Sequence, residues 1–291
     1  MKLRPTLRLV GVYAASFMTV VWALAPIYWI LVSSVSTRTE LLAKPYKHWI
    51  PQSPTLQNFV DILTKGQKYR AGGTLPTSEL LIAGLKNSLF ISISVAIIVT
   101  LLATLAGYIF ARIKFRLKDT AFLYIMFLMP LPIWVSLVSL YFMMTRAGLN
   151  DSSYGLILIL GTVALPLAVL LMTTFIRDLP QEIEEAASID GASRWQTLWL
   201  IIFPLALPGV SSVLLVSFLN TWNAYMIPMI FSNTAKSQTI TVVLTLFIGQ
   251  YETAWEQMAA ATVLVMIPPI LLALFFQRYL VRGLSMGAVN G

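Results

Sequence analysis

The segment from Arg177 to Ser193 carries charged and small side chains of the kind that contact another protein. Pro180 suits the first turn of a helix, and the three glutamates at 182, 184 and 185 would lie near its positive end. Gly191 suits a left-handed helix end, and Ser193 can cap a second helix. These signals predict a short helix, a sharp turn and a second helix, and a solvated loop with good caps is the alternative.

Several other chemistries are excluded by residue content. The chain has no cysteine and a single histidine, His48, so thiolate catalysis and a Cys-ligated metal are excluded and a multi-His site is disfavoured. It also has no Gly-x-x-x-x-Gly-Lys-Ser/Thr loop, so it does not hold ATP by that mechanism. We expect no metal and no cofactor on this chain.

The composition is that of a membrane protein. Of 291 residues 58% are hydrophobic, only 11% are charged, and the mean hydropathy is +0.79. The net charge is +8, but the charged residues lie between apolar runs and form no basic stripe, which argues against binding of nucleic acid. Runs of about 20 apolar residues predict helices that cross a membrane. Six are expected, at 9–35, 85–111, 121–144, 156–176, 198–219 and 259–280, while 239–249 is too short to cross.

The distribution of lysine and arginine predicts the orientation. Eleven lie on the side of the N-terminus and nine on the other, but seven of those nine lie between Arg38 and Lys86, in or just after the long first loop. Short loops obey the positive-inside rule best, so both termini are expected in the cytoplasm. The predicted organisation is an N-terminus and first span at 1–35, an external loop at 36–84, a transmembrane core at 85–280 with a cytoplasmic loop at 177–197, and a cytoplasmic tail at 281–291.

Glu185-Ala186-Ala187, Gly191 four residues later, Ile201 and Phe203-Pro204 together resemble the EAA motif of ABC importer permeases. The resemblance implies an all-α ABC type I importer permease fold. It also implies that this loop is a coupling helix seated in an ATP-binding subunit. The coupling residues implied are Glu184, Glu185, Ala186, Ala187, Asp190 and Gly191.

Further segments resemble the carbohydrate permeases, similar to the six-span maltose-transporter subunit. They are Pro26-Ile27-Tyr28-Trp29, Asn87-Ser88, Asn220-Thr221-Trp222-Asn223 and the tail from Gln277 to Gly291. The resemblance implies an assembly in the bacterial inner membrane with a second permease subunit, two ATP-binding subunits that hold ATP and Mg, and an extracytoplasmic solute-binding protein. Sugar and membrane lipid are the remaining partners.

A sugar path is expected to use amides and flat aromatic faces. The candidates are Asn87, Trp134, Tyr141, Asn220, Trp222, Asn223 and Tyr225. The alternative is that these aromatic rings form interfacial belts and the amides bond neighbouring helices. The first loop, counted up to Lys86, has seven basic and three acidic residues, which adds acidic saccharides to the expected substrates.

Two rival functions stay open at this point. One is an ABC importer permease for another small solute. The other is a secondary transporter, which would need ionisable residues deep in the spans. The interiors of the second, third, fourth and sixth predicted spans contain none, since Lys86 and Arg278 lie at span ends, which disfavours ion coupling.

Overall fold

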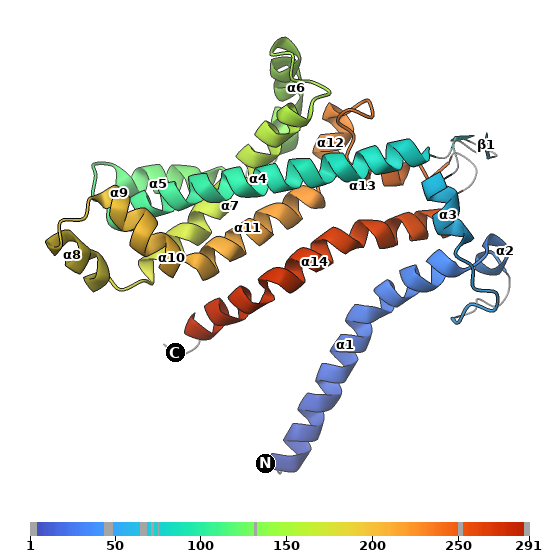
Figure 1. Cartoon of the computed structure of the whole chain (residues 1–291), viewed down its shortest axis with the longest axis horizontal. Coiled ribbons are helices and arrows are strands. Elements are labelled where there is room, and N and C mark those ends of the chain that lie inside the picture. Colours follow the sequence, from blue (N-terminus) through green and yellow to red (C-terminus); the bar gives the residue numbers. More distant parts are fainter. Residues whose placement is uncertain are drawn as a thin grey trace. The chain divides into compact units, whose positions relative to one another are not determined.

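The computed structural model describes residues 5–43, 49–64, 69–70, 73–74, 76–130, 133–249 and 253–287. The chain divides into two compact units (Figure 1). Unit 1 is the chain up to Ile82 together with Val243–Ile267, and unit 2 is Ala83–Val242 together with the chain from Pro268. His48, the basic residues at 44, 47, 65 and 68, and the last four tail residues lie outside the described residues.

Unit 2 is built on three long helices that lie side by side (Figure 1). They are α4 (Ser78–Arg112, from residue 83 on), α7 (Ser153–Arg177) and α11 (Leu207–Trp222). Gly107 of α4 permits the close approach, because a Cβ there would lie 2.8 Å from the Cβ of Met172 in α7. Small residues at such contacts let membrane helices pack closely. The core between the helices is aliphatic, with Val95, Val99 and Ile176 almost fully buried.

Four single helices are long and apolar enough to cross a membrane. They are α1 (Pro5–Val35), α4, α7 and α14 (Trp255–Gly287), and they confirm helices at four of the six predicted spans. A fifth candidate is a bent pair, Arg194–Leu205 and Leu207–Trp222, whose halves are inclined by 78°. The chain therefore has four to five candidate spans in its described part, where the sequence predicts six.

The predicted span at 121–144 is wrong as a continuous helix. The structure has α5 (Lys118–Phe127), a 3-10 turn η1 (Ile133–Ser136) and α6 (Leu137–Arg146) instead. Pro130 and Pro132 lie between the two helices in sequence, and proline lacks the N–H that a helix needs.

The predicted span at 198–219 is also wrong as one straight helix. It begins with α9 (Arg194–Gln196), continues through a π-helix η2 (Thr197–Ile202) and α10 (Phe203–Leu205), and bends before α11. Pro204 and Pro208 flank the bend. Neither proline has an N–H to donate to the carbonyl four residues before it, and the helix bends between them.

In unit 1 the first loop packs against the end of α1. The loop holds α2 (Arg38–Leu41), α3 (Gln57–Thr64) and a two-residue strand pair, β1 (Tyr69–Arg70) with β2 (Gly73–Thr74). The side-chain amide of Asn58 donates to the carbonyls of Ser34 and Ser36, each at 2.9 Å, which ties α3 to α1. The loop is therefore less irregular than its prolines and glycines suggest. The short apolar segment at 239–249 forms α13 (Ile240–Thr245).

Candidate functional site

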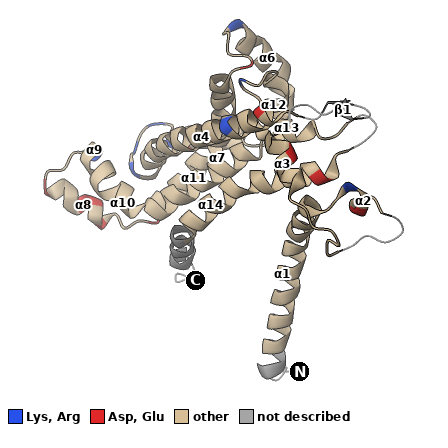
Figure 2. Ribbon diagram, turned by 45° about the vertical axis from the view of Figure 1, so that its right-hand side comes forward, with Lys and Arg blue, Asp and Glu red and all other residues tan. Residues whose placement is uncertain are grey.

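The segment after α7 folds as the sequence predicts. Helix α8 spans Glu182–Ile189, with three glutamates in its first turn. Gly191 has φ of 82°, the left-handed conformation that favours glycine. Ser193 then caps α9 through a capping box with Gln196. The helix, turn and second helix project from one end of unit 2, and red in the ribbon of Figure 2 marks the acidic residues of α8.

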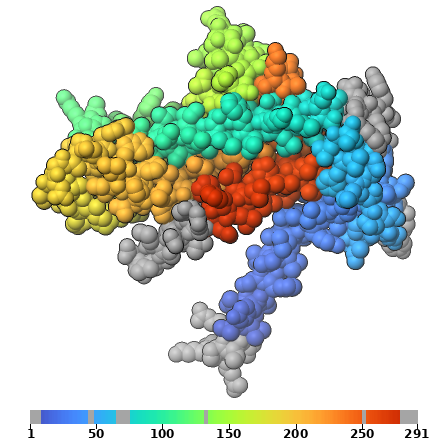
Figure 3. Space-filling model, in the orientation of Figure 1, coloured from blue at the N-terminus to red at the C-terminus, as the bar shows by residue number. Residues whose placement is uncertain are grey.

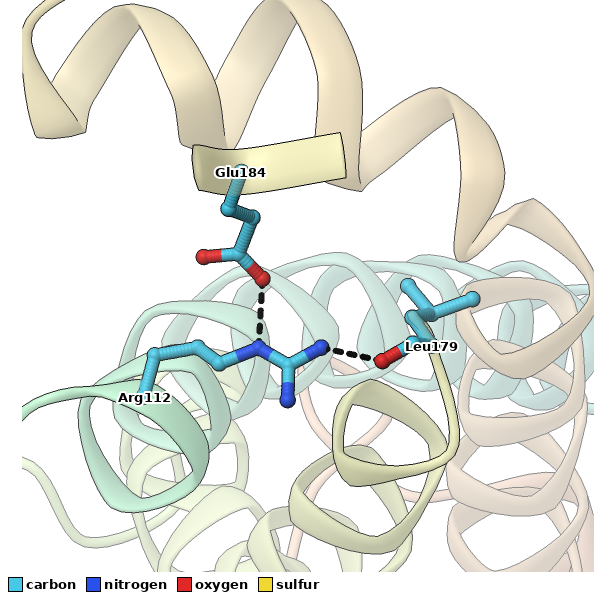
Figure 4. Close-up of polar contacts among 3 residues, drawn as sticks. All are labelled: Arg112, Leu179 and Glu184. Carbon is cyan, nitrogen blue, oxygen red and sulfur yellow. Dashed lines mark hydrogen bonds and ion pairs between the residues drawn. The ribbon is translucent and has the colours of Figure 1, made fainter. Parts of the chain in front are cut away.

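An ion pair fastens α8 to the end of α4 (Figure 4). The guanidinium of Arg112 donates through Nε to a carboxylate oxygen of Glu184, and through Nη2 to the carbonyl of Leu179 at 2.6 Å. Both charged side chains are largely shielded from water, with exposed fractions of 7% for Arg112 and 14% for Glu184. The contact joins residues 72 positions apart and fixes both the start of α8 and the chain that enters it.

Most other side chains of α8 are open to solvent (Figure 3). Glu185, Ala186, Ser188 and Asp190 are exposed, and Ile189 exposes 86% of its surface. The predicted coupling residues therefore separate into two groups. Glu185, Ala186, Asp190 and Gly191 are accessible to another protein, whereas Glu184 and Ala187 face this chain's own helices.

A second polar cluster lies at the other end of α4. The side-chain amide of Asn87 donates to the carbonyls of Ala235 and Gln238, both at 3.0 Å. The hydroxyl of Ser88 accepts the backbone N–H of Ile240 at 2.8 Å. These bonds hold the loop between α12 (Met226–Phe231) and α13. They match the alternative expected for Asn87, a bond to a neighbouring segment.

Asp151 holds the same loop and was missed from the sequence. Its carboxylate accepts the backbone N–H groups of Asn233 and Thr234 at 2.8 and 3.0 Å and the hydroxyls of Thr234 and Ser237 at 2.7 and 2.6 Å. Asp151 itself has φ of 53°, an uncommon conformation that aspartate tolerates better than most residues. Its place just before the cap of α7 gives no indication of partners more than 80 positions away.

We expect Asp151→Asn to loosen the loop at 232–238. Burial raises the pKa of Asp151, but the hydrogen bonds from Ser237, Thr234 and Asn233 outweigh it and lower the pKa from 3.8 to about 2. A lowered folded-state pKa means that the stabilisation is full above the ordinary pKa and is lost as pH falls towards 2. Solvent screening limits the stabilisation by the Asp151 carboxylate to about 1 kcal/mol.

Hydrogen exchange of the Asn233 and Thr234 amides measures this effect. The variant should exchange faster at neutral pH, and wild type should approach it in acid. The exposed Asp119→Asn is the matched control, since it removes one carboxylate elsewhere. Equal exchange in wild type and Asp151→Asn at neutral pH would show that the carboxylate does not hold the loop.

The predicted path residues are not gathered into one cavity. Trp222 is 2% exposed and stacks on Phe218 with ring centres 5.6 Å apart. Asn220 and Asn223 are exposed and Tyr225 is half-buried. Trp134 and Tyr141 lie exposed on η1 and α6. Their role in a path stays a prediction. No group of three His, Cys, Asp or Glu side chains suited to a metal ion occurs in the described part of the chain.

Residues 102–286 match the family described as the inner membrane component of binding-protein-dependent transport systems. The chain belongs to this family. It is a multi-pass inner-membrane permease subunit, and ATP hydrolysis is carried by separate subunits. The match includes the whole of α8 and its turn.

Individual relatives agree with the family. A probable ABC transporter permease protein of Pyrococcus horikoshii is 33% identical over 261 residues, covering 90% of each chain. A trehalose/maltose transport system permease protein of Thermococcus litoralis is 31% identical, covering 98% of this chain and 97% of its own. Among solved structures, a bacterial ABC transporter involved in the import of the acidic polysaccharide alginate matches with a TM-score of 0.78. It covers 96% of this chain and 99% of its own at 20% identity, which supports the fold.

Proposed function

We propose that this permease imports a sugar or oligosaccharide delivered by an extracytoplasmic binding protein. The observation that carries the proposal is the end-to-end similarity to the trehalose/maltose permease, with 31% identity over 286 residues. A trehalose transport system permease protein of Mycobacterium tuberculosis supports it at 33% identity, covering 93% of each chain.

The proposed coupling element is the exposed face of α8. Glu185 presents a carboxylate, and Ala186 leaves room for a close contact with an ATP-binding subunit. Gly191 makes the turn between α8 and α9. Glu184 has a different proposed role, because its carboxylate is engaged by Arg112. It positions α8, and Glu185 contacts the partner.

The proposed assembly contains a second permease subunit, two ATP-binding subunits carrying ATP and Mg, and the binding protein. We propose that both termini are cytoplasmic, which places α8 on the side where ATP is available. Six crossings are compatible with the described helices if α5 and α6 together form one interrupted span and the bent pair ending in α11 forms another. Irregular backbone at membrane depth is tolerated where protein buries it.

The loop at 232–238 is the proposed contact with the binding protein. It lies at the end of unit 2 away from α8, and Asp151, Asn87 and Ser88 hold it in place. A loop held at several points loses less conformational freedom when a partner binds it. This gives Asn87 a positioning role beside the contact, in addition to its predicted place on the path.

An acidic saccharide stays a narrower prediction within the proposed function. It rests on the seven basic residues of the first loop, of which the side chains at 44, 47, 65, 68 and 70 lie outside the described residues. Clustered positive charge would attract an anionic substrate and would be screened by salt.

The experiment that identifies the substrate is ATP hydrolysis by the purified complex with its binding protein and a panel of solutes. Neutral disaccharides, uronate oligomers and amino acids are compared at low and high salt. The proposal expects stimulation by one saccharide class and none by amino acids. Stimulation by amino acids alone would favour the competing importer for another small solute.

A further inference from the structure

A pocket of about 320 Å³ lies between the end of α4, the loop that follows it and the helices α8 and α9. Four basic side chains line it, together with two carboxylates: Arg112, Lys114, Lys118 and Arg194, with Glu184 and Glu185. Because Arg112 is paired with Glu184, three cations face one remaining carboxylate. The pocket therefore has an excess of positive charge, and Figure 2 shows basic residues in blue in the loop after α4 and at α9.

In the part of the chain that the structure describes, the three cations have no carboxylate partner within ion-pair distance. Among the described residues of this region, Arg112 and Glu184 form an ion pair, and Lys114, Lys118 and Arg194 form none. Like charges held together without counter-charges repel one another. An anion in the pocket would remove that repulsion.

Exposed apolar side chains neighbour the pocket's basic residues along the chain, and we call Phe115, Leu117 and Trp195 the apolar rim. Phe115 and Leu117 alternate with the lysines of the loop and expose 41% and 68% of their surfaces. Leu117 has φ of 66°, a conformation that is uncommon for a residue other than glycine. On the other side Trp195 is 63% exposed and begins a row of rings with Trp199 and Phe203, at 5.6 and 5.2 Å. Tryptophan beside basic residues is typical of the membrane–water interface.

We propose that this pocket binds the phosphate of an anionic phospholipid headgroup. Basic pockets at the ends of membrane helices suit such headgroups, and the apolar rim suits the acyl chains beside them. An acidic side chain of an ATP-binding subunit would satisfy the charge but not the rim. The bound lipid would link the loop after α4 to α8, the same two segments that the Arg112–Glu184 pair joins. This lipid site depends on the chain lying in a membrane, but it does not depend on the proposed transport of a sugar.

The test measures lipid retention by the purified transporter complex, reconstituted in nanodiscs of phosphatidylcholine with or without phosphatidylglycerol. Native mass spectrometry counts the phosphatidylglycerol that stays bound. Lys118→Gln and Arg194→Gln should each weaken retention about fivefold, the effect of one basic residue near an anionic surface. Arg116→Gln is the matched control, because Arg116 is exposed in the same loop but does not line the pocket.

Two further measurements distinguish a lipid from the other possible anions, which are free phosphate and an acidic side chain of an ATP-binding subunit. Inorganic phosphate is added to compete with the lipid, and a photoreactive amino acid at Gln181, which lines the pocket, reports what lies there. The proposal expects lipid cross-links and no competition by phosphate at millimolar levels. It is overturned by equal retention in all variants, by displacement with free phosphate, or by cross-links to an ATP-binding subunit alone. Retention is measured without transport, so these outcomes leave the proposed function untouched.

Discussion

Arg112→Ala is expected to uncouple the permease from ATP hydrolysis while the chain still inserts. The variant leaves Glu184 shielded without its partner and leaves the Leu179 carbonyl without a donor. Removing one member of a buried ion pair costs about 3 kcal/mol. The lost free energy weakens the attachment of α8 to α4, so transport should drop at least tenfold. The measurements are substrate uptake and hydrogen exchange across residues 180–190.

A double-mutant cycle shows whether the pair acts as a unit. Arg112→Ala combined with Glu184→Ala should lose no more than Arg112→Ala alone, because the stranded carboxylate is then gone. Arg116→Ala removes a nearby exposed arginine and should leave exchange in α8 unchanged. Normal uptake and exchange in Arg112→Ala would show that α8 is held in some other way.

Gly191→Leu is expected to abolish uptake, the second large effect. At φ of 82° a side chain strains the backbone by about 1–2 kcal/mol. A Cβ at this position has no other atom within 4 Å, so the variant creates no clash inside the chain. The leucine would project from an exposed turn into the surface proposed to dock on the ATP-binding subunit. Gly191→Asn should retain most activity, because asparagine tolerates this conformation.

Gly148 provides a matched control for the strain itself. It has φ of 67°, and a Cβ there also has no other atom within 4 Å, but it lies between α6 and α7. Gly148→Leu should therefore carry a similar backbone cost without loss of coupling. If both leucine variants lose uptake equally, strain and not docking explains the effect, and the role of Gly191 is purely structural.

Features determined by neighbouring residues could be predicted from the sequence. The turn at Gly191 and the cap at Ser193 depend on residues within one or two turns of a helix, and both are present. Helices at four predicted spans followed from the length of their apolar runs. The prolines at 130, 132, 204 and 208 were also readable as helix breakers. Hydropathy alone counts a run through them as one span, which explains the two wrong predictions.

Contacts between distant segments could not be predicted in the same way. Arg112 and Glu184 were each visible as charges, but nothing local indicates that they pair across 72 positions. The sequence therefore placed Glu184 beside Glu185 as an exposed coupling residue. Asp151 shows the same limit, because its partners come from the loop before α13. Only the packing of α7 against α11 and α12 brings them together.

We propose that this chain transmits the conformational change driven by ATP hydrolysis to a path for sugar. The most direct measurement is ATP hydrolysis by the reconstituted complex with and without sugar-loaded binding protein. We expect loaded binding protein to stimulate hydrolysis in wild type, and Gly191→Leu to abolish the stimulation although the subunits still assemble. Uptake that follows an ion gradient and proceeds without ATP hydrolysis would contradict it.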